Sequence, residues 1–167
     1  LFRIKFDYHN IKAILKAERR GISPEGLLLS GGRYDAERMQ NEWHQEHRLT
    51  ASDTARDATE KAAVLLREND PQGADLMLDA ACYAEMAALA AETKSGFLQG
   101  YVRQLIDAAN LRTAVRAARS GSSEVLPRAL LEGGSVSPHG IMMTEPGKLG
   151  ELFGAVALEK AAALGAA

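Results

Sequence analysis

Residues 7–21 read DYHNIKAILKAERRG, and residues 107–121 read DAANLRTAVRAARSG. In the same register, both stretches carry Asp, Asn, an aliphatic residue, two basic residues four positions apart, Ala, Arg and a closing Gly. A generic amphipathic pattern repeats apolar spacing but not matching charges and glycines, so the chain contains an internal repeat. The sequences that follow also correspond after a two-residue shift, with LLSGG at 28–32 and LLEGG at 130–134.

One stripe of each repeated helix combines polar and apolar residues. At 100° per residue, Asp7 and Asn10 fall on the same face as the aliphatic positions, and so do Asp107 and Asn110. Buried polar groups need partners, so we expect these side chains to bond to backbone groups or basic side chains of a neighbouring segment. The structural repeat motif consists of Asp7, Asn10, Gly21, Asp107, Asn110 and Gly121.

The other side of each repeated helix is basic. A stripe of this kind can be a solvated face, a phosphate-binding face or a contact for an acidic partner. A solvated face is the commonest meaning for a single helix, but recurrence in both copies keeps a partner-facing role equally open. The candidate contact residues are Lys12, Lys16, Arg19, Arg112, Arg116 and Arg119.

Composition predicts an all-α helical bundle of pseudo-repeated units with no significant sheet. The chain has 167 residues, of which 29 are alanine; only 5% are aromatic, and no segment alternates apolar with polar residues over the length of a strand. We expect two repeat units, residues 1–95 and 96–167. The expected helices cover residues 5–20, a short one restarting at 23–25, 34–47, about 53–68, 71–94, 97–119, 124–131 and 148–164.

Charge and cysteine content narrow the class of protein. With 20 basic against 22 acidic residues, nucleic acid is not the default partner. Cys82 is the single cysteine, so no internal disulfide can form, which suits a reducing compartment. The apolar runs are too short to cross a bilayer. Because the chain opens LFRIK without Met or a signal pattern, we expect it to be a piece of a longer, non-secreted protein.

Local motifs for catalysis or metal binding are weak. His44 and His47 lie three residues apart near Glu42 and Glu46, but a polar helix face explains them better than a metal site. The Gly-Gly pairs lack the Lys-Ser/Thr of a nucleotide-binding loop, and no Gly-x-Ser-x-Gly occurs. The position of Cys82 in mid-helix, among Ala and Tyr residues, predicts that it serves as a small buried apolar side chain and not as a reactive thiol. The sequence therefore predicts no cofactor, no metal and no catalytic residue.

The pattern Asp-x-x-Asn-(Ile/Leu)-(Lys/Arg)-x-x-(Leu/Val)-(Lys/Arg)-Ala-x-x-x-Gly resembles the repeated helix of the central-stalk subunit of V-type and archaeal A-type rotary ATPases, called C in prokaryotes and d in eukaryotes. Residues 78–83, LDAACY, followed by 101–121, also resemble that family's approach to a repeat helix. The resemblance is strongest over residues 5–32 and 72–134 and weak over 135–167. It implies a longer parent built from three all-helical units that form a funnel.

The resemblance also implies a mechanical, non-catalytic function. The family's subunit lies on the cytoplasmic face of the membrane, without spanning it, as a socket between the rotating shaft and the membrane rotor ring. Under this interpretation the Asp and Asn positions stabilise each unit, and the basic positions belong to the funnel surface or unit junctions. The alternatives are a nucleic-acid-binding helical repeat using the Lys/Arg stripes, an α-helical enzyme with an unrecognised carboxylate site, and an unrelated helical scaffold.

Overall fold

The computed structural model describes residues 1–154, and every regular element among them is a helix. The expected all-α fold is therefore confirmed. The chain divides into two compact units, Leu1–Met86 and a second that begins at Ala87. A compact unit is not a repeat unit, so the expected repeat boundaries at 1–95 and 96–167 stay a prediction.

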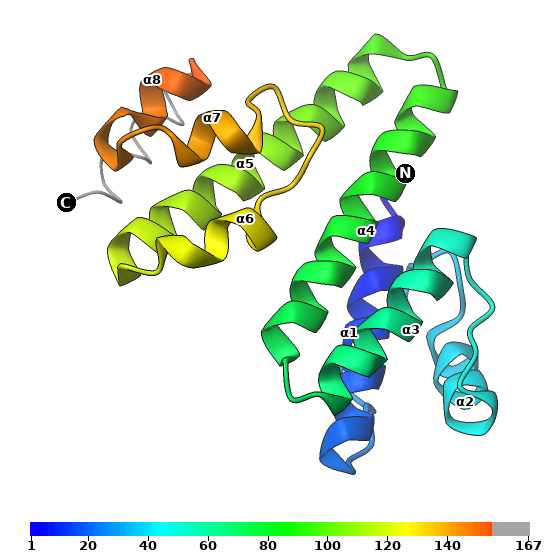
Figure 1. Cartoon of the computed structure of the whole chain (residues 1–167). Coiled ribbons are helices and arrows are strands. Elements are labelled where there is room, and N and C mark those ends of the chain that lie inside the picture. The colour runs from blue at the N-terminus through cyan, green and yellow to red at the C-terminus, as the bar shows by residue number, and fades with distance from the viewer. Residues whose placement is uncertain (155–167) are drawn as a thin grey trace. The chain divides into compact units, whose positions relative to one another are not determined.

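The first unit holds three helices and most of a fourth (Figure 1). They are α1 (Ile4–Arg20), α2 (Ala36–Glu46), α3 (Asp53–Arg67) and α4 (Pro71–Glu92), the last of which continues past the boundary at Met86. Helix α1 packs against α2 and α3, so it is the central element of this unit.

The second unit is organised around α5 (Gly96–Ser120), the longest helix among the described residues. It contacts a series of short elements that follow it: η1 (Ser123–Val125), α6 (Leu126–Ala129), α7 (Pro138–Met142) and η2 (Pro146–Lys148). The last described helix, α8 (Leu149–Phe153), packs on η2. Each unit thus places one long repeat helix at its centre.

The repeat helices α1 and α5 end in the same way. Gly21 and Gly121 take left-handed φ values of 64° and 67°. The next amide in each copy, of Ile22 and Ser122, donates to the carbonyl of Ala17 or Ala117 at 3.0 Å. This is the Schellman geometry, which favours glycine because a Cβ is strained at positive φ.

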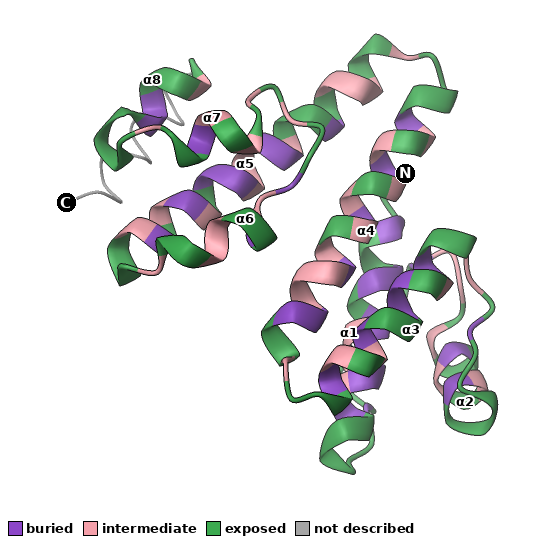
Figure 2. Cartoon of the chain, in the orientation of Figure 1, coloured by how far each residue is buried: buried purple, intermediate pink, exposed green. Residues whose placement is uncertain are grey.

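Buried residues form a continuous stripe along each repeat helix (Figure 2). In α1 the stripe includes both Asp7 and Asn10, and in α5 it includes Asp107 and Asn110. The four polar side chains are between 0% and 2% exposed, among apolar neighbours such as Ile11. Burial of this kind obliges each polar group to find a partner inside its own unit.

Two helix predictions were wrong: the short helix expected to restart at 23–25 is not formed, and the helix expected over 148–164 does not continue through Gly154. No helix restarts at Ser23; Pro24–Leu27 is a turn in which the Leu27 amide donates to the Pro24 carbonyl at 2.9 Å, with Gly26 at φ 77°. Side chains at the start of α1 and just before it bind the carbonyls of this segment in place of helical hydrogen bonds: Arg3 Nε donates to the Gly31 carbonyl at 2.8 Å, and His9 Nε2 lies 3.0 Å from the Leu27 oxygen.

The helix predicted over 148–164 is also different. Within the described residues α8 ends at Phe153, because Gly154 takes a left-handed φ of 64°; the remainder of that prediction lies outside them. Helix α7 was not predicted, although Ser137 and Pro138 are a recognisable start: the Ser137 hydroxyl accepts from the Gly140 amide at 3.1 Å. In the described part of the chain, no helix is both long and apolar enough to cross a membrane.

Candidate functional site

The repeated Asn anchors the loop that follows each repeat helix. Asn10 Nδ2 donates to the Leu29 carbonyl at 2.9 Å, and the Leu29 amide donates back to Asn10 Oδ1 at 2.8 Å. Asn110 makes the same two bonds with Leu131, at 2.8 and 2.7 Å. Because an amide side chain can donate through its nitrogen and accept through its oxygen, it satisfies both backbone groups of the loop residue that it faces.

The repeated Asp binds the same loop a few residues further on. Asp7 Oδ1 accepts from the amides of Arg33 and Tyr34, at 2.7 and 3.3 Å. Asp107 Oδ1 accepts from the amides of Ser135 and Val136, at 2.8 and 3.4 Å. We call each Asp–Asn pair with its bound loop a polar clamp: the first is Asp7 and Asn10 on residues 29–34, the second Asp107 and Asn110 on residues 131–136.

The second glycine of each Gly-Gly pair makes room for the clamp. A Cβ at Gly32 would overlap Asp7 Oδ1, and a Cβ at Gly134 would overlap Asp107 Oδ1. The preceding residues, Gly31 and Gly133, take φ values of 102° and 91°. Both glycines of each pair are therefore required, one for conformation and one for space.

The clamp also positions the next helix. Asp35 Oδ1 accepts from the Arg38 amide at 2.8 Å and starts α2, while Ser137 starts α7 at the corresponding position. Met39 and Ile141 then occupy equivalent places and are 1% and 2% exposed. The two copies thus share a helix, a clamped loop, a capped second helix and a buried apolar residue, which makes them one structural module built twice.

The copies differ in what binds the second carboxylate oxygen. Arg33 Nε donates to Asp7 Oδ2 at 2.6 Å, and Arg33 Nη1 pairs with Glu85 Oε1 of α4 at 2.7 Å. Burial alone would lower the pKa of Arg33, but its hydrogen bonds to Glu85 and Asp7 outweigh this, and the pKa lies above its ordinary value. In the second clamp the corresponding residue is Ser135, which has no cationic side chain.

Tyr8 extends the first clamp toward α4, and its hydroxyl donates to Glu85 Oε2 at 2.9 Å. Burial, followed by the negative charge of Glu85, raises the pKa of Tyr8 far above its ordinary value of 10.0. The unfolded chain loses this proton above about pH 10, whereas the folded chain keeps it, so stability present below pH 10 is lost as the pH rises further.

Between pH 9 and pH 11, urea unfolding of the Tyr8→Phe variant should therefore show a smaller loss of stability than that of the parent chain. Identical slopes for the parent and Tyr8→Phe would contradict the assignment.

The basic stripe of α1 is paired within the first unit. Lys12 Nζ lies 2.8 Å from Asp79 Oδ1, and Lys16 Nζ lies 2.8 Å from Asp75 Oδ2, both carboxylates belonging to α4. Lys12 and Lys16 are accordingly only partly exposed. Arg19 donates to the side-chain oxygen of Asn69. These positions join α1 to α4 and its preceding turn.

The basic stripe of α5 is arranged differently. Arg112, Arg116 and Arg119 are all exposed. Arg112 Nε makes a 3.3 Å bond to the Ala108 carbonyl of its own helix, and neither Arg116 nor Arg119 has an ion pair or hydrogen bond from its side chain to any of residues 1–154. The predicted contact residues thus separate into a paired set on α1 and an open set on α5.

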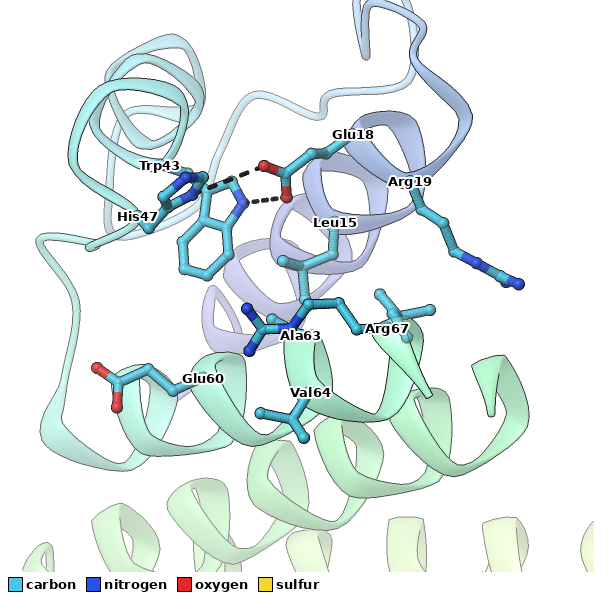
Figure 3. Close-up of a pocket in the computed structure, with 10 residues that line it drawn as sticks. Leu15, Glu18, Arg19, Trp43, His47, Glu60, Ala63, Val64 and Arg67 are labelled. Carbon is cyan, nitrogen blue, oxygen red and sulfur yellow. Dashed lines mark hydrogen bonds and ion pairs between the residues drawn. The ribbon is translucent and has the colours of Figure 1, made fainter. Parts of the chain in front are cut away.

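A cavity of about 680 Å³ lies beside α1 in the first unit (Figure 3). Glu18 stands at its rim, where Trp43 Nε1 donates to Oε2 at 2.7 Å and His47 Nδ1 lies 3.6 Å from Oε1. Glu60 and Arg67 of α3 line the opposite side. Glu18 therefore ties α1 to the end of α2, a structural role.

Within the described residues, neither His44 nor His47 belongs to a group of three side chains that could hold a metal ion. Among residues 1–154 no group of three His, Cys, Asp or Glu side chains is arranged to hold a metal ion. His47 instead packs edge-on against Trp43, with ring centroids 5.5 Å apart, and closes α2 at a positive φ of 49°.

Cys82 lies buried in the middle of α4. Burial, with a smaller contribution from Asp79, raises the pKa of its thiol to about 12. Since the thiolate is the reactive form, the folded protein should react with iodoacetamide at pH 8 at least about 100-fold more slowly than the same protein in 8 M urea. Mass spectrometry of the alkylated product checks this, and equal rates would show that α4 opens readily.

Several residues at these sites could not be assigned a role from sequence. Arg33 and Glu85 complete the first clamp, yet neither lies in the repeated motif. Gly32 and Gly134 were visible as part of the two-residue-shifted match, but their contact with the Asp carboxylates was not. The signal that was available is that a Gly-Gly pair follows the Asp in both copies, 24 residues after Asp7 and 26 residues after Asp107.

A comparison with protein families assigns the chain to one of them. The family model described as ATP synthase (C/AC39) subunit matches residues 1–158, which is nearly the whole chain. No curated protein and no solved structure matches the chain. The match includes both polar clamps, both repeat helices and the whole of α4. The chain therefore belongs to the ATP synthase (C/AC39) subunit family.

Proposed function

We propose that this chain is a non-catalytic rotor subunit of a V/A-type rotary ATPase, which couples the central shaft to the membrane rotor ring. It would lie on the cytoplasmic face of the membrane, as a peripheral part of the complex. The observation that carries the proposal is the family match over residues 1–158, which includes both copies of the clamped helix module.

The internal bonding of each unit supports a mechanical role. A part that transmits torque needs helices that resist rotation against their loops. Each clamp provides four hydrogen bonds between buried side chains and loop backbone, and the first clamp adds the Arg33 ion pairs. Hydrogen bonds between buried groups fix one arrangement, because a displacement leaves these groups unsatisfied.

The nucleic-acid alternative loses support from the pairing on α1. A phosphate-binding face that is repeated in both units would need its cations free in both. Lys12 and Lys16 are instead neutralised by Asp79 and Asp75. The shared stripe is therefore better explained by helix-to-helix contacts than by binding to phosphates.

A reconstitution experiment tests the coupling role. An ATPase complex assembled without this subunit should still hydrolyse ATP but should lose ATP-driven ion transport, and adding the purified full-length protein should restore transport. Co-purification with the shaft and the rotor ring should accompany the restoration. Loss of ATP hydrolysis in the depleted complex would indicate a catalytic role, and unaffected transport would exclude a coupling role.

A further inference from the structure

We propose that the side of α5 that carries Arg112 and Arg116 is the docking surface for a further helix of the same polypeptide, one that follows residue 167. This helix runs antiparallel to α5 and presents two carboxylates, four residues apart, to the two arginines. The inference rests on the internal repeat and on the contact between α1 and α4, and not on the rotor assignment.

The contact between α1 and α4 shows how the basic side of a repeat helix is covered in the first unit. Lys16 Nζ lies 2.8 Å from Asp75 Oδ2, and Lys12 Nζ lies 2.8 Å from Asp79 Oδ1. The earlier lysine meets the later aspartate, so the two helices are antiparallel. On both helices the paired residues are four positions apart, which is about one helical turn.

The two aspartates of α4 lie at the edge of its buried stripe. Ala74 and Leu78 are 2% and 1% exposed, and Asp75 and Asp79 directly follow them in the sequence. Helix α4 thus combines an apolar stripe with one acid beside it on each of two successive turns. An apolar residue followed by an acid, repeated after four positions, is therefore the pattern of a helix that covers this side of the repeat helix.

Helix α5 presents the same charges in the same register, but without a cover. Arg112 and Arg116 take the places of Lys12 and Lys16 in the repeat, and both are exposed. No ion pair joins either arginine to a carboxylate of residues 1–154. Because opposite charges on facing helices favour association, a pair of carboxylates one turn apart complements these two cations.

Apolar residues on the same side of α5 are also incompletely covered. Leu105 and Ala108 fall within 40° of Arg112 on the helix, and both are only partly buried. Tyr8, the counterpart of Ala108 in α1, is 2% exposed and bonds to α4 through its hydroxyl. The open side of α5 therefore offers both parts of the surface that α4 covers on α1, an apolar strip and two cations.

The order of elements favours the same polypeptide over a separate partner as the source of the cover. In the first copy the chain covers itself, since Asp75 lies 59 residues after Lys16. The second copy repeats the long helix, the clamped loop and the capped helix α7, and no counterpart of α4 follows up to residue 154. A position 59 residues after Arg116 lies beyond residue 167.

Zero-length cross-linking identifies what covers α5. A carbodiimide joins a lysine amine to a carboxylate that it contacts, so the pairs Lys12–Asp79 and Lys16–Asp75 serve as internal controls for the fold and the reagent. The experiment uses the full-length polypeptide, both isolated and assembled in its complex, and the chain of residues 1–167. Mass spectrometry of tryptic peptides locates each cross-link.

The variants Arg112→Lys and Arg116→Lys keep the cation and make each position reactive. In the isolated full-length polypeptide, we expect both to cross-link within the molecule to one helix after residue 167. Position 116 should join the first of two carboxylates four residues apart, and position 112 the second. Both cross-links should be lost in the chain of residues 1–167, because no acidic residue lies one turn from either position along α5.

Four results would overturn the proposal. A cross-link from position 112 or 116 to another subunit, formed only in the assembled complex, would show that a separate partner covers α5. A cross-link between two copies of the polypeptide would show a self-association surface. Control cross-links without any at position 112 or 116 would show that this side of α5 stays open. Attachment of position 112 to the first carboxylate and position 116 to the second would contradict the antiparallel arrangement.

Discussion

Replacement of Asp7 by alanine should lower the free energy of unfolding of the first unit by about 3–5 kcal/mol. The carboxylate is fully buried and accepts from the Arg33 amide, the Tyr34 amide and the Arg33 guanidinium. Its removal leaves the loop amides unsatisfied and strips the partly buried guanidinium of one of its two carboxylates, so the loss exceeds that of a single hydrogen bond. Urea unfolding followed by the fluorescence of Trp43, the single tryptophan, reports this unit.

Asp107→Ala is the matched comparison. Its carboxylate accepts two loop amides but no cationic side chain of the described residues, so the expected loss is about 1–3 kcal/mol, measured by circular dichroism because the second unit lacks a tryptophan within residues 87–154. A loss in Asp7→Ala no larger than in Asp107→Ala would contradict the energetic role assigned to Arg33.

Replacement of Gly32 by alanine should also be strongly destabilising, by about 1–3 kcal/mol, and Gly134→Ala should behave in the same way. A Cβ at either position overlaps the Oδ1 atom of the clamp Asp, so the carboxylate must leave the loop amides that it binds. The cause is lack of space, since neither residue has a positive φ.

Gly100→Ala provides the control for the glycine variants. Gly100 lies inside α5, and a Cβ there meets no atom within 4 Å. Alanine should therefore stabilise the chain by about 0.5–1 kcal/mol through its higher helix propensity. If Gly32→Ala and Gly134→Ala unfolded at the same urea concentration as the parent chain, the tight fit between glycine and clamp would be wrong.

The long helices could be predicted from sequence because their signals are local. Pro71 and Ser52 mark helix starts, Gly21 and Gly121 mark helix ends, and apolar spacing fixes the buried stripe between them. Loop 23–32 was predicted as partly helical, because its local sequence does not reveal that Asn10 and Arg3 bind its backbone in an extended form. Tertiary bonds of this kind override local preference.

The polar clamps could be predicted in part. Repetition identified Asp7, Asn10, Asp107 and Asn110 as buried polar positions in need of partners. Their partners come from loops 19 to 29 residues further along the chain. In the first clamp Arg33, which binds Asp7, is itself paired with Glu85, and no periodicity connects Glu85 to the clamp. The difference between the two basic stripes was equally hidden, because it depends on α4 carrying the carboxylates that pair with the stripe of α1, whereas the arginines of α5 are exposed.

Cross-linking in an actively hydrolysing complex tests the rotor assignment most directly. Since Cys82 is buried, a cysteine introduced at an exposed position such as Phe97 or Met143 would be the reactive thiol of this chain. A disulfide from that cysteine to the shaft should form in high yield and leave ATP-driven rotation intact, because both parts turn together. If the cross-link to the shaft stopped rotation, or if the same cysteine joined a stationary subunit without stopping it, this chain would not be part of the rotor.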